Sequence, residues 1–191
     1  MKLKSPAQNK NAAKLEKQIA ALKQKLWREY KKSKPVQIED YEVTAGGAKK
    51  RLSELFGSHS EMILIHNMGL DCAYCTLWAD GLNGFAAYYS KRAALVLEND
   101  ENPAALTRFA AKRGWKFPVV SSEGSPLKED LGFKVKDSYV PGISSLKKDA
   151  KGRIFQVNAT VLGPGDNFCS IFDLFSLLPK GIGEFQPNYD L

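Results

Sequence analysis

Residues 71–76 read Asp71-Cys72-Ala73-Tyr74-Cys75-Thr76 and hold two of the three cysteines in this 191-residue chain. An apolar run precedes them at residues 62–65, and a helical pattern of apolar residues follows them. A helix that begins here places both sulfurs on its first turn, where unpaired backbone N–H groups and the helix dipole favour a thiolate over a thiol. The stretch therefore predicts a redox-active pair in which Cys72, the more exposed thiol, attacks and Cys75 resolves.

Two other interpretations of the cysteine pair are open: two small buried hydrophobic residues, or half of a metal site. A four-ligand zinc site needs two further ligands, and the sequence offers Cys169, His59 and His66 without a second C-x-x-C. We therefore expect no metal, and thiol-disulfide chemistry at the pair needs no bound cofactor. Cys169 lies on an apolar helical face beside Phe168 and Phe172, which predicts a buried structural cysteine, with a third redox partner as the alternative.

The composition is that of a soluble globular protein, because 43% of the residues are hydrophobic and no run of about 18 uncharged apolar residues occurs. The first residues lead into charged positions rather than an apolar segment, so we expect no secretory signal, no membrane-spanning segment and a cytoplasmic location. Three cysteines are too few for a disulfide scaffold. In a reducing compartment a C-x-x-C more often cycles or binds metal than staples a fold.

The net charge of +7 is unevenly distributed along the chain. Residues 1–34 contain eleven basic residues and two glutamates, a net charge of +9, which leaves 17 basic and 19 acidic residues, a net charge of −2, for the rest. The surface of the main domain is therefore not expected to bind nucleic acid.

The basic excess belongs to an amphipathic helix expected over residues 11–32 and stopped by Pro35. Its apolar positions recur in steps of three and four residues: Ala12, Leu15, Ile19, Leu22 and Leu26. We predict an extension at residues 1–35 and a domain at residues 36–191. The helix is expected to dock on its own domain or on a second subunit, which would make a homodimer; binding to nucleic acid or an anionic membrane is the alternative.

The first part of the domain is expected to alternate strands and helices, and the last part to form a hairpin followed by a helix. Buried strands are predicted at residues 62–68 and 93–97 and an extended segment at 117–120, with a helix from the Asn102-Pro103 start signal to Gly114 between the last two. A crossover of this kind predicts parallel pairing. One extended stretch is expected at residues 36–44, a short helix at 52–57 and another at 125–131. A hairpin at residues 143–161 and a helix at 166–178 complete the chain.

Several segments, in one order, resemble a known family. They are the block from Asp71 to Gly84, the passage Phe117-Pro118-Val119-Val120-Ser121-Ser122-Glu123-Gly124, the segment Val140-Pro141-Gly142 before the hairpin, and Gly163-Pro164-Gly165-Asp166-Asn167-Phe168-Cys169. Together they are similar to the thioredoxin-like domain-of-unknown-function family 899, whose members are described as predicted dithiol-disulfide oxidoreductases. The resemblance implies an α/β, thioredoxin-like fold with a central mixed sheet flanked by helices, related to thioredoxins and peroxiredoxins.

The sequence departs from both better-known relatives. The pair between the cysteines is Ala73-Tyr74 rather than the Gly-Pro of thioredoxins, so the redox potential of thioredoxin does not transfer. Peroxiredoxins resemble one another in a motif that places a threonine shortly before the reactive cysteine. This chain has Met68 and Gly69 in that region, which disfavours a peroxide-activating site.

The thioredoxin resemblance also implies roles for residues around the pair. Pro141 is expected to form a cis bond with Val140, so that the Val140 backbone can pair with an extended substrate. Tyr74 is expected at the rim of the site. Trp78 is a candidate for substrate contact or, more simply, for core packing.

Three further residues are candidate modulators of the thiol pKa or of proton transfer. Asp71 and Asp80 flank the pair, although Asp71 alone would serve as a helix cap and Asp80 as a solvated surface residue. His66 ends the strand ahead of the pair, where a hydrogen-bonded core histidine is the alternative.

The sequence thus predicts an enzyme, a thiol-disulfide oxidoreductase acting on a protein or small-molecule thiol or disulfide and restored by an external thiol reductant. A peroxiredoxin-like thiol peroxidase and a non-catalytic binding module of the same fold are the alternatives.

Overall fold

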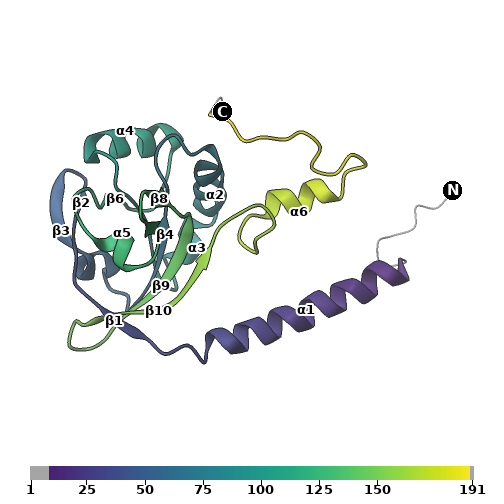
Figure 1. Cartoon of the computed structure of the whole chain (residues 1–191), viewed down its shortest axis with the longest axis horizontal. Helices are drawn as coiled ribbons and strands as arrows, with labels where there is room; N and C mark the ends of the chain where they lie inside the picture. Colours follow the sequence, from purple (N-terminus) through teal and green to yellow (C-terminus); the bar gives the residue numbers. More distant parts are fainter. Residues whose placement is uncertain (1–8, 190–191) are drawn as a thin grey trace. The chain divides into compact units, whose positions relative to one another are not determined.

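A computed structural model describes residues 9–189, which divide into two compact units, one ending at Lys34 and the other beginning at Pro35 (Figure 1). The first unit contains one helix, α1 (Lys10–Tyr30), in agreement with the helix predicted from the apolar spacing. Asn9 caps it, because its side chain accepts hydrogen bonds from the backbone N–H groups of Asn11 and Ala12. Within residues 9–189, no helix is long and apolar enough to cross a bilayer.

The second unit is built on an eight-stranded sheet with the strand order β1-β10-β9-β4-β5-β6-β2-β3. These strands are β1 (Val36–Ile38), β2 (Glu42–Ala45), β3 (Ala48–Arg51), β4 (Glu61–His66), β5 (Ala94–Asn99), β6 (Val119–Ser121), β9 (Gly142–Lys148) and β10 (Ile154–Val161). A separate pair consists of β7 (Lys134–Val135) and β8 (Ser138–Tyr139). The helices are η2 (Leu52–Phe56), α2 (Ala73–Asn83), α3 (Ala86–Tyr89), α4 (Pro103–Arg113), α5 (Leu127–Asp130) and α6 (Ser170–Ser176).

The connectivity is that of the predicted thioredoxin-like plan. β4, β5 and β6 run parallel, and α2, α3 and α4 lie in the connections between them. β9 then pairs antiparallel with β4, and β10 antiparallel with β9. Figure 1 shows β9 and β10 as long adjacent strands that lead into α6. The expected parallel crossover and the C-terminal hairpin are both confirmed.

The two faces of the sheet carry separate apolar cores, because successive side chains of a strand point to opposite faces. Leu64 of β4 belongs to a core that also contains Phe56 of η2 and Leu127 of α5. Ile65, the next residue, belongs to a core that contains residues of α2, α3 and α4, among them Leu82. The sheet is thus covered on both sides, which explains the continuous apolar runs at residues 62–65 of β4 and 94–97 of β5.

The main differences from the sequence prediction lie at the N-terminal edge of the domain. Residues 36–44 form two strands, β1 and β2, rather than one extended stretch. Gly46 and Gly47, both with positive φ, then turn the chain into β3, which was not predicted. All four residues of β3 are exposed, so its sequence lacks the hydrophobic pattern that would identify a strand.

Candidate functional site

A tight loop joins the end of β4 to Cys72. Gly69 adopts a φ of 148°, and a Cβ there would lie 3.0 Å from the Glu101 side chain and 3.1 Å from that of Asp71. The loop is held by two side chains that accept from its backbone: Asn67 Oδ1 from Gly69 N at 2.8 Å, and Glu101 Oε1 from Leu70 N at 3.3 Å. These bonds fix the position at which α2 begins.

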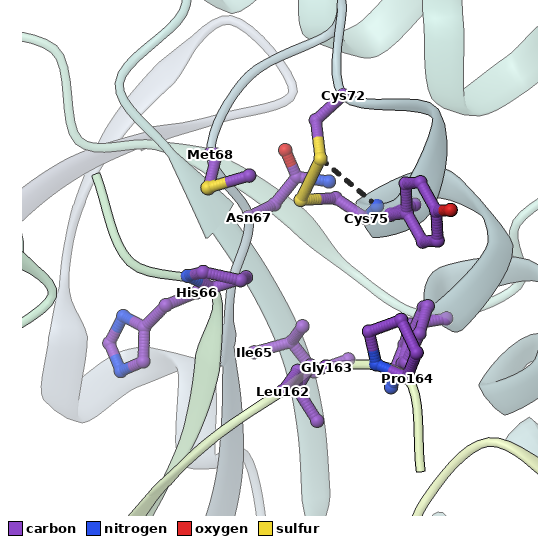
Figure 2. Close-up of a pocket in the computed structure, with 12 residues that line it drawn as sticks. Ile65, His66, Asn67, Met68, Cys72, Cys75, Leu162, Gly163 and Pro164 are labelled. Atoms are coloured by element: carbon purple, nitrogen blue, oxygen red, sulfur yellow. Dashed lines mark hydrogen bonds between the residues drawn. A yellow bond between two sulfur atoms is a disulfide. The ribbon is translucent and has the colours of Figure 1, made fainter. Parts of the chain in front are cut away.

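Cys72 and Cys75 form a disulfide at the first turn of α2 (Figure 2). Cys72 is the N-cap residue of this helix, and its Sγ accepts a hydrogen bond from the backbone N–H of Cys75 at 3.1 Å. Cys72 is half-buried, whereas Cys75 is only 7% exposed, the order of exposure that the spacing suggests. An N–H donor and the positive end of the helix dipole both stabilise negative charge on the Cys72 sulfur once the disulfide is reduced.

A cavity of about 190 Å³ opens beside the disulfide. It is lined mainly by apolar side chains, from the end of β4, from α2 and from the loops next to β9 and β10: Ile65, His66, Asn67, Met68, Cys72, Tyr74, Cys75, Trp78, Pro141, Leu162, Gly163 and Pro164. Figure 2 shows both sulfurs on one side of this space, with Leu162, Gly163 and Pro164 on another. The cavity therefore gives an apolar group direct access to the cysteine pair.

Asp166 organises the loop after β10 that forms part of this lining. Its Oδ2 accepts hydrogen bonds from the indole N–H of Trp78 at 2.7 Å and from Gly163 N at 2.9 Å. Its Oδ1 accepts from the backbone of Phe168 and Cys169 at 2.6 and 3.1 Å. Because Asp166 makes these turn contacts, α6 begins at Ser170 and not at residue 166 as predicted.

Tyr74 and Trp78, both expected near the site, line the cavity from α2. The Tyr74 hydroxyl donates to Gln186 Oε1 at 2.8 Å, which ties the C-terminal segment to the site. Trp78 is buried and its ring lies 5.5 Å from that of Phe172 in α6. Trp78 therefore packs in the core through one side and contributes to the cavity through another.

A buried polar network surrounds the side chain of His66. Its Nδ1 donates to Glu98 Oε1 at 2.6 Å, and its Nε2 accepts from Ser144 Oγ at 2.8 Å, an assignment that follows because an ionised carboxylate can only accept. Ser122 Oγ donates to the other oxygen of Glu98 at 2.8 Å. Lys128 Nζ lies 3.3 Å from Glu98 Oε1. All five residues are buried, and within residues 9–189 no buried polar side-chain atom lacks a partner.

The charge state of this network follows from burial and pairing. Burial lowers the pKa of His66 below its ordinary value of 6.5, and the hydrogen bond and charge of Glu98 offset that effect only in part. Burial alone would raise the pKa of Glu98, but the His66 hydrogen bond and the Lys128 charge outweigh it, so this pKa lies below its ordinary value of 4.5. At neutral pH the network holds a neutral His66 and an ionised Glu98 with Lys128 as counter-ion.

The network touches the cavity through its edge. Figure 2 shows the His66 ring turned away from the two sulfurs. Lys128 Nζ donates to the backbone carbonyl of Asn67, a cavity residue, at 2.5 Å. The cluster therefore supports the loop before Cys72, while the His66 ring points away from both sulfurs (Figure 2).

This charge arrangement predicts a pH-dependent stability. Below pH 6.5 His66 is protonated in the unfolded chain but not in the folded protein. The free energy of unfolding therefore decreases as the pH is lowered, by up to about 1.4 kcal/mol per pH unit, until the pH reaches the depressed pKa of His66 in the folded protein. Glu98 adds a second loss below its ordinary value of 4.5. In His66→Gln we expect the pH dependence due to His66 to disappear. The measurement is the free energy of unfolding from urea titrations at several pH values between about pH 5 and pH 7, a window chosen around the ordinary histidine pKa.

The matched control for that experiment is His59→Gln, since His59 lies outside the network and is half-exposed. It should keep the slope of the parent protein. If His66→Gln kept the slope as well, the assignment of a neutral, buried His66 would be wrong.

The structure does not bring the two predicted aspartates into the cavity. Asp71 is exposed and does not cap α2, because Cys72 itself occupies the N-cap position. Asp80 pairs with the guanidinium of Arg113 and accepts from the indole N–H of Trp115 at 2.8 Å. Asp80 is thus a partly buried residue that links α2 to α4, and it does not line the cavity beside the cysteines.

The predicted cis bond between Val140 and Pro141 is wrong. No peptide bond among residues 9–189 is cis. Pro141 lines the cavity, but the Val140 N–H already donates to the Phe133 carbonyl at 2.9 Å, so it is not a free donor for a substrate strand. The Pro141 carbonyl accepts from Leu162 N at 2.8 Å. The bond is therefore trans, the isomer that X–Pro bonds ordinarily prefer.

Cys169 is a free, buried cysteine, as predicted, and it packs with Trp78, Leu162 and Phe172. Burial raises the pKa of its thiol. It does not line the cavity. Within the described part of the chain, no group of three or more His, Cys, Asp or Glu side chains is arranged to hold a metal ion.

Sequence reasoning missed the partners of His66. Glu98 was detectable in principle, since it is a charged residue that directly follows the apolar run at residues 94–97 of β5, and the parallel register places it directly beside His66. Lys128 gave no such signal, because it lies in a four-residue helix of ordinary composition. Asn67, Met68 and Leu162 were missed as lining residues.

Together, the sheet order and the disulfide at the start of α2 define a thioredoxin-like protein with a C-x-x-C site. The chain belongs to the family described as "Bacterial protein of unknown function (DUF899)", whose model matches residues 6–190. No curated protein matches the chain.

Solved structures share the fold at low sequence identity. Peroxidoxin BcpB from Mycobacterium tuberculosis is 17% identical, with a TM-score of 0.56 over 72% of this chain and 90% of that chain. A PrxQ mutant from Xylella fastidiosa is 16% identical, with a TM-score of 0.53 over 66% and 84% of the two chains. A putative thiol:disulfide interchange protein, DsbE, from Chlorobium tepidum is 18% identical, with a TM-score of 0.51 over 70% and 89%. These likenesses establish the thioredoxin-like fold.

Proposed function

We propose that this protein is a thiol-disulfide oxidoreductase that works through Cys72 and Cys75. The observation that carries the proposal is the disulfide at the N-terminus of α2, which borders an apolar cavity open to a partner group. The pair thus combines an environment that favours a thiolate with access for a second sulfur.

In the reduced protein, the Cys72 thiolate attacks one sulfur of a substrate disulfide and releases the other as a thiolate. The Cys75 thiolate, formed as its proton passes to that leaving group, then attacks Cys72 Sγ. This step breaks the mixed disulfide, forms the Cys72–Cys75 bond and releases the second substrate thiolate, which takes a proton from solvent. Two electrons pass from the protein to the substrate, and an external thiol reductant restores the pair.

Exposure supports this division of roles. Cys72 is half-buried and accepts the Cys75 N–H, whereas Cys75 is almost fully buried one turn inward. The sulfur of a bulky substrate therefore reaches Cys72 more easily than Cys75. The apolar lining, with Tyr74, Trp78 and Pro141 at the cavity, favours a substrate with an apolar group next to its sulfur.

The test is a redox titration of the intact protein in glutathione and dithiothreitol buffers, with free thiols counted by mass spectrometry. We expect a reversible two-electron couple between roughly −300 and −120 mV, the range of working thiol-disulfide proteins. Two thiols should titrate together and Cys169 should stay reduced. A pair that does not reform its disulfide under mild oxidation would rule out the proposal, and peroxide consumption with a thiol donor would replace it with a peroxidase.

A further inference from the structure

The apolar stripe of α1 has no partner among the described residues of its own unit, 9–34. None of the 21 residues of this helix, all of them described, is buried. The large apolar side chains of the stripe are between 38% and 61% exposed: Leu15, Ile19, Leu22 and Leu26. A row of four large apolar side chains along one helix is a surface that a partner would cover.

The spacing of the stripe selects the kind of partner. Ala12, Leu15, Ile19, Leu22 and Leu26 follow strict steps of three and four residues, an average of 3.5. Trp27, 53% exposed, lies beside this series, but every leucine and isoleucine of α1 belongs to it. Such a stripe at two positions per heptad is typical of the narrow seam of a two-helix coiled coil, whereas a helix that lies on a domain or a membrane presents a broader face. We propose that α1 pairs, antiparallel, with α1 of a second copy of this chain.

The charges beside the seam favour the antiparallel orientation. Glu16 and Lys23 follow the seam residues Leu15 and Leu22, so they lie on the same edge of the helix, one heptad apart. When two copies run in opposite directions with Ile19 facing the second copy's Leu22, Glu16 of each helix faces Lys23 of the other. The dimer therefore gains two symmetric ion pairs.

A parallel pair would lose this complementarity. The same two residues would then face the opposite edge of the partner helix, where Asn11 and Gln18 present neutral amides. Charge thus distinguishes two orientations that the apolar seam alone would allow.

The remaining basic residues do not prevent pairing. Of the other basic residues of α1, Lys10, Lys14, Lys17 and Arg28 lie on the side of the helix turned away from the seam. Lys25 lies on the seam edge opposite to that of Glu16 and Lys23, where it faces the neutral Gln18 of the second copy. Across a pair of helices, each about 10 Å in diameter, the charges turned away from the seam are separated by roughly two Debye lengths at physiological ionic strength. They keep the outside of the pair basic and soluble, while the seam edges carry the charges that decide pairing.

The experiment is sedimentation of the full chain over roughly two orders of magnitude in concentration. We expect a reversible monomer–dimer equilibrium. Ile19→Asp should weaken it at least tenfold, because each dimer would bury two carboxylates in the seam. Gln24→Asp, the same new side chain on the opposite face of α1, should leave it within about twofold. Circular dichroism checks that both variants keep their helix.

The orientation is tested by exchanging charges. Glu16→Lys and Lys23→Glu should each weaken dimerisation about three- to tenfold, and the double variant should restore it, because the pairs reform with opposite polarity. A monomer at every concentration, a dimer indifferent to Ile19→Asp, or a double variant no better than the singles would each overturn the proposal. Binding of the monomer to vesicles of anionic lipid would assign the stripe to a membrane instead.

Discussion

Replacing Lys128 with methionine should lower the free energy of unfolding at neutral pH by about 3–5 kcal/mol, the typical cost of removing one partner from a buried ion pair. Glu98 is fully buried and ionised, and Lys128 supplies the positive charge that faces it at 3.3 Å. Methionine preserves much of the volume of lysine but leaves the carboxylate without a counter-ion. It also removes the donor to the Asn67 carbonyl. Urea unfolding followed by tryptophan fluorescence measures the loss.

Lys134→Met is the matched control for Lys128→Met. The Nζ atoms of both lysines lie over the ring of Tyr139, at 5.2 Å for Lys134 and 5.5 Å for Lys128, but Lys134 is half-exposed and has no contact with Glu98. Its substitution should cost less than about 1 kcal/mol. Adding Glu98→Gln to Lys128→Met should recover part of the loss, since the uncompensated charge is removed. Equal costs for the two lysine variants would contradict the buried pairing.

Replacing Cys75 with serine should reduce turnover on a disulfide-linked model peptide by on the order of a thousandfold, equivalent to about 4 kcal/mol of transition-state stabilisation. Under the proposed function, Cys72 would still attack the substrate, but no second thiol could release it. We therefore expect a stable mixed disulfide between Cys72 and half of the peptide, visible by intact mass spectrometry. Cys72→Ser should lose both the turnover and the adduct.

Cys169→Ser is the control for the two active-site substitutions. Cys169 is buried away from the cavity, so its replacement should leave turnover near that of the parent protein. Full turnover in Cys75→Ser would point to chemistry that needs a single thiol and would contradict the resolving role of Cys75. An adduct on Cys75 in Cys72→Ser would reverse the two roles.

Local chemistry made the centre of the fold predictable. The C-x-x-C after a buried strand identified the start of α2, and Asn102-Pro103 with Gly114 marked both ends of α4, because caps and turn residues act over a few positions. The same reasoning failed for β3, whose exposed residues are defined by pairing and not by hydrophobicity.

The surroundings of the cysteine pair depend on long-range contacts that no local pattern encodes. Asp166 looks like an ordinary turn residue in the sequence, yet it binds the Trp78 indole 88 positions away. Similarly, the Asn67 carbonyl meets Lys128, 61 positions away. These contacts require the sheet order first, so a single sequence predicted the thiols far better than the cavity beside them.

The use of Cys72 as the N-cap of α2 has a consequence for how the protein can be observed. The backbone N–H of Cys75 donates a hydrogen bond to Cys72 Sγ. The strength of this bond depends on what is attached to that sulfur: a proton, Cys75 itself or a foreign molecule. The helix end is thereby a built-in reporter of chemical state. A resonance from a single backbone position could identify which compounds the protein accepts before any assay for them exists.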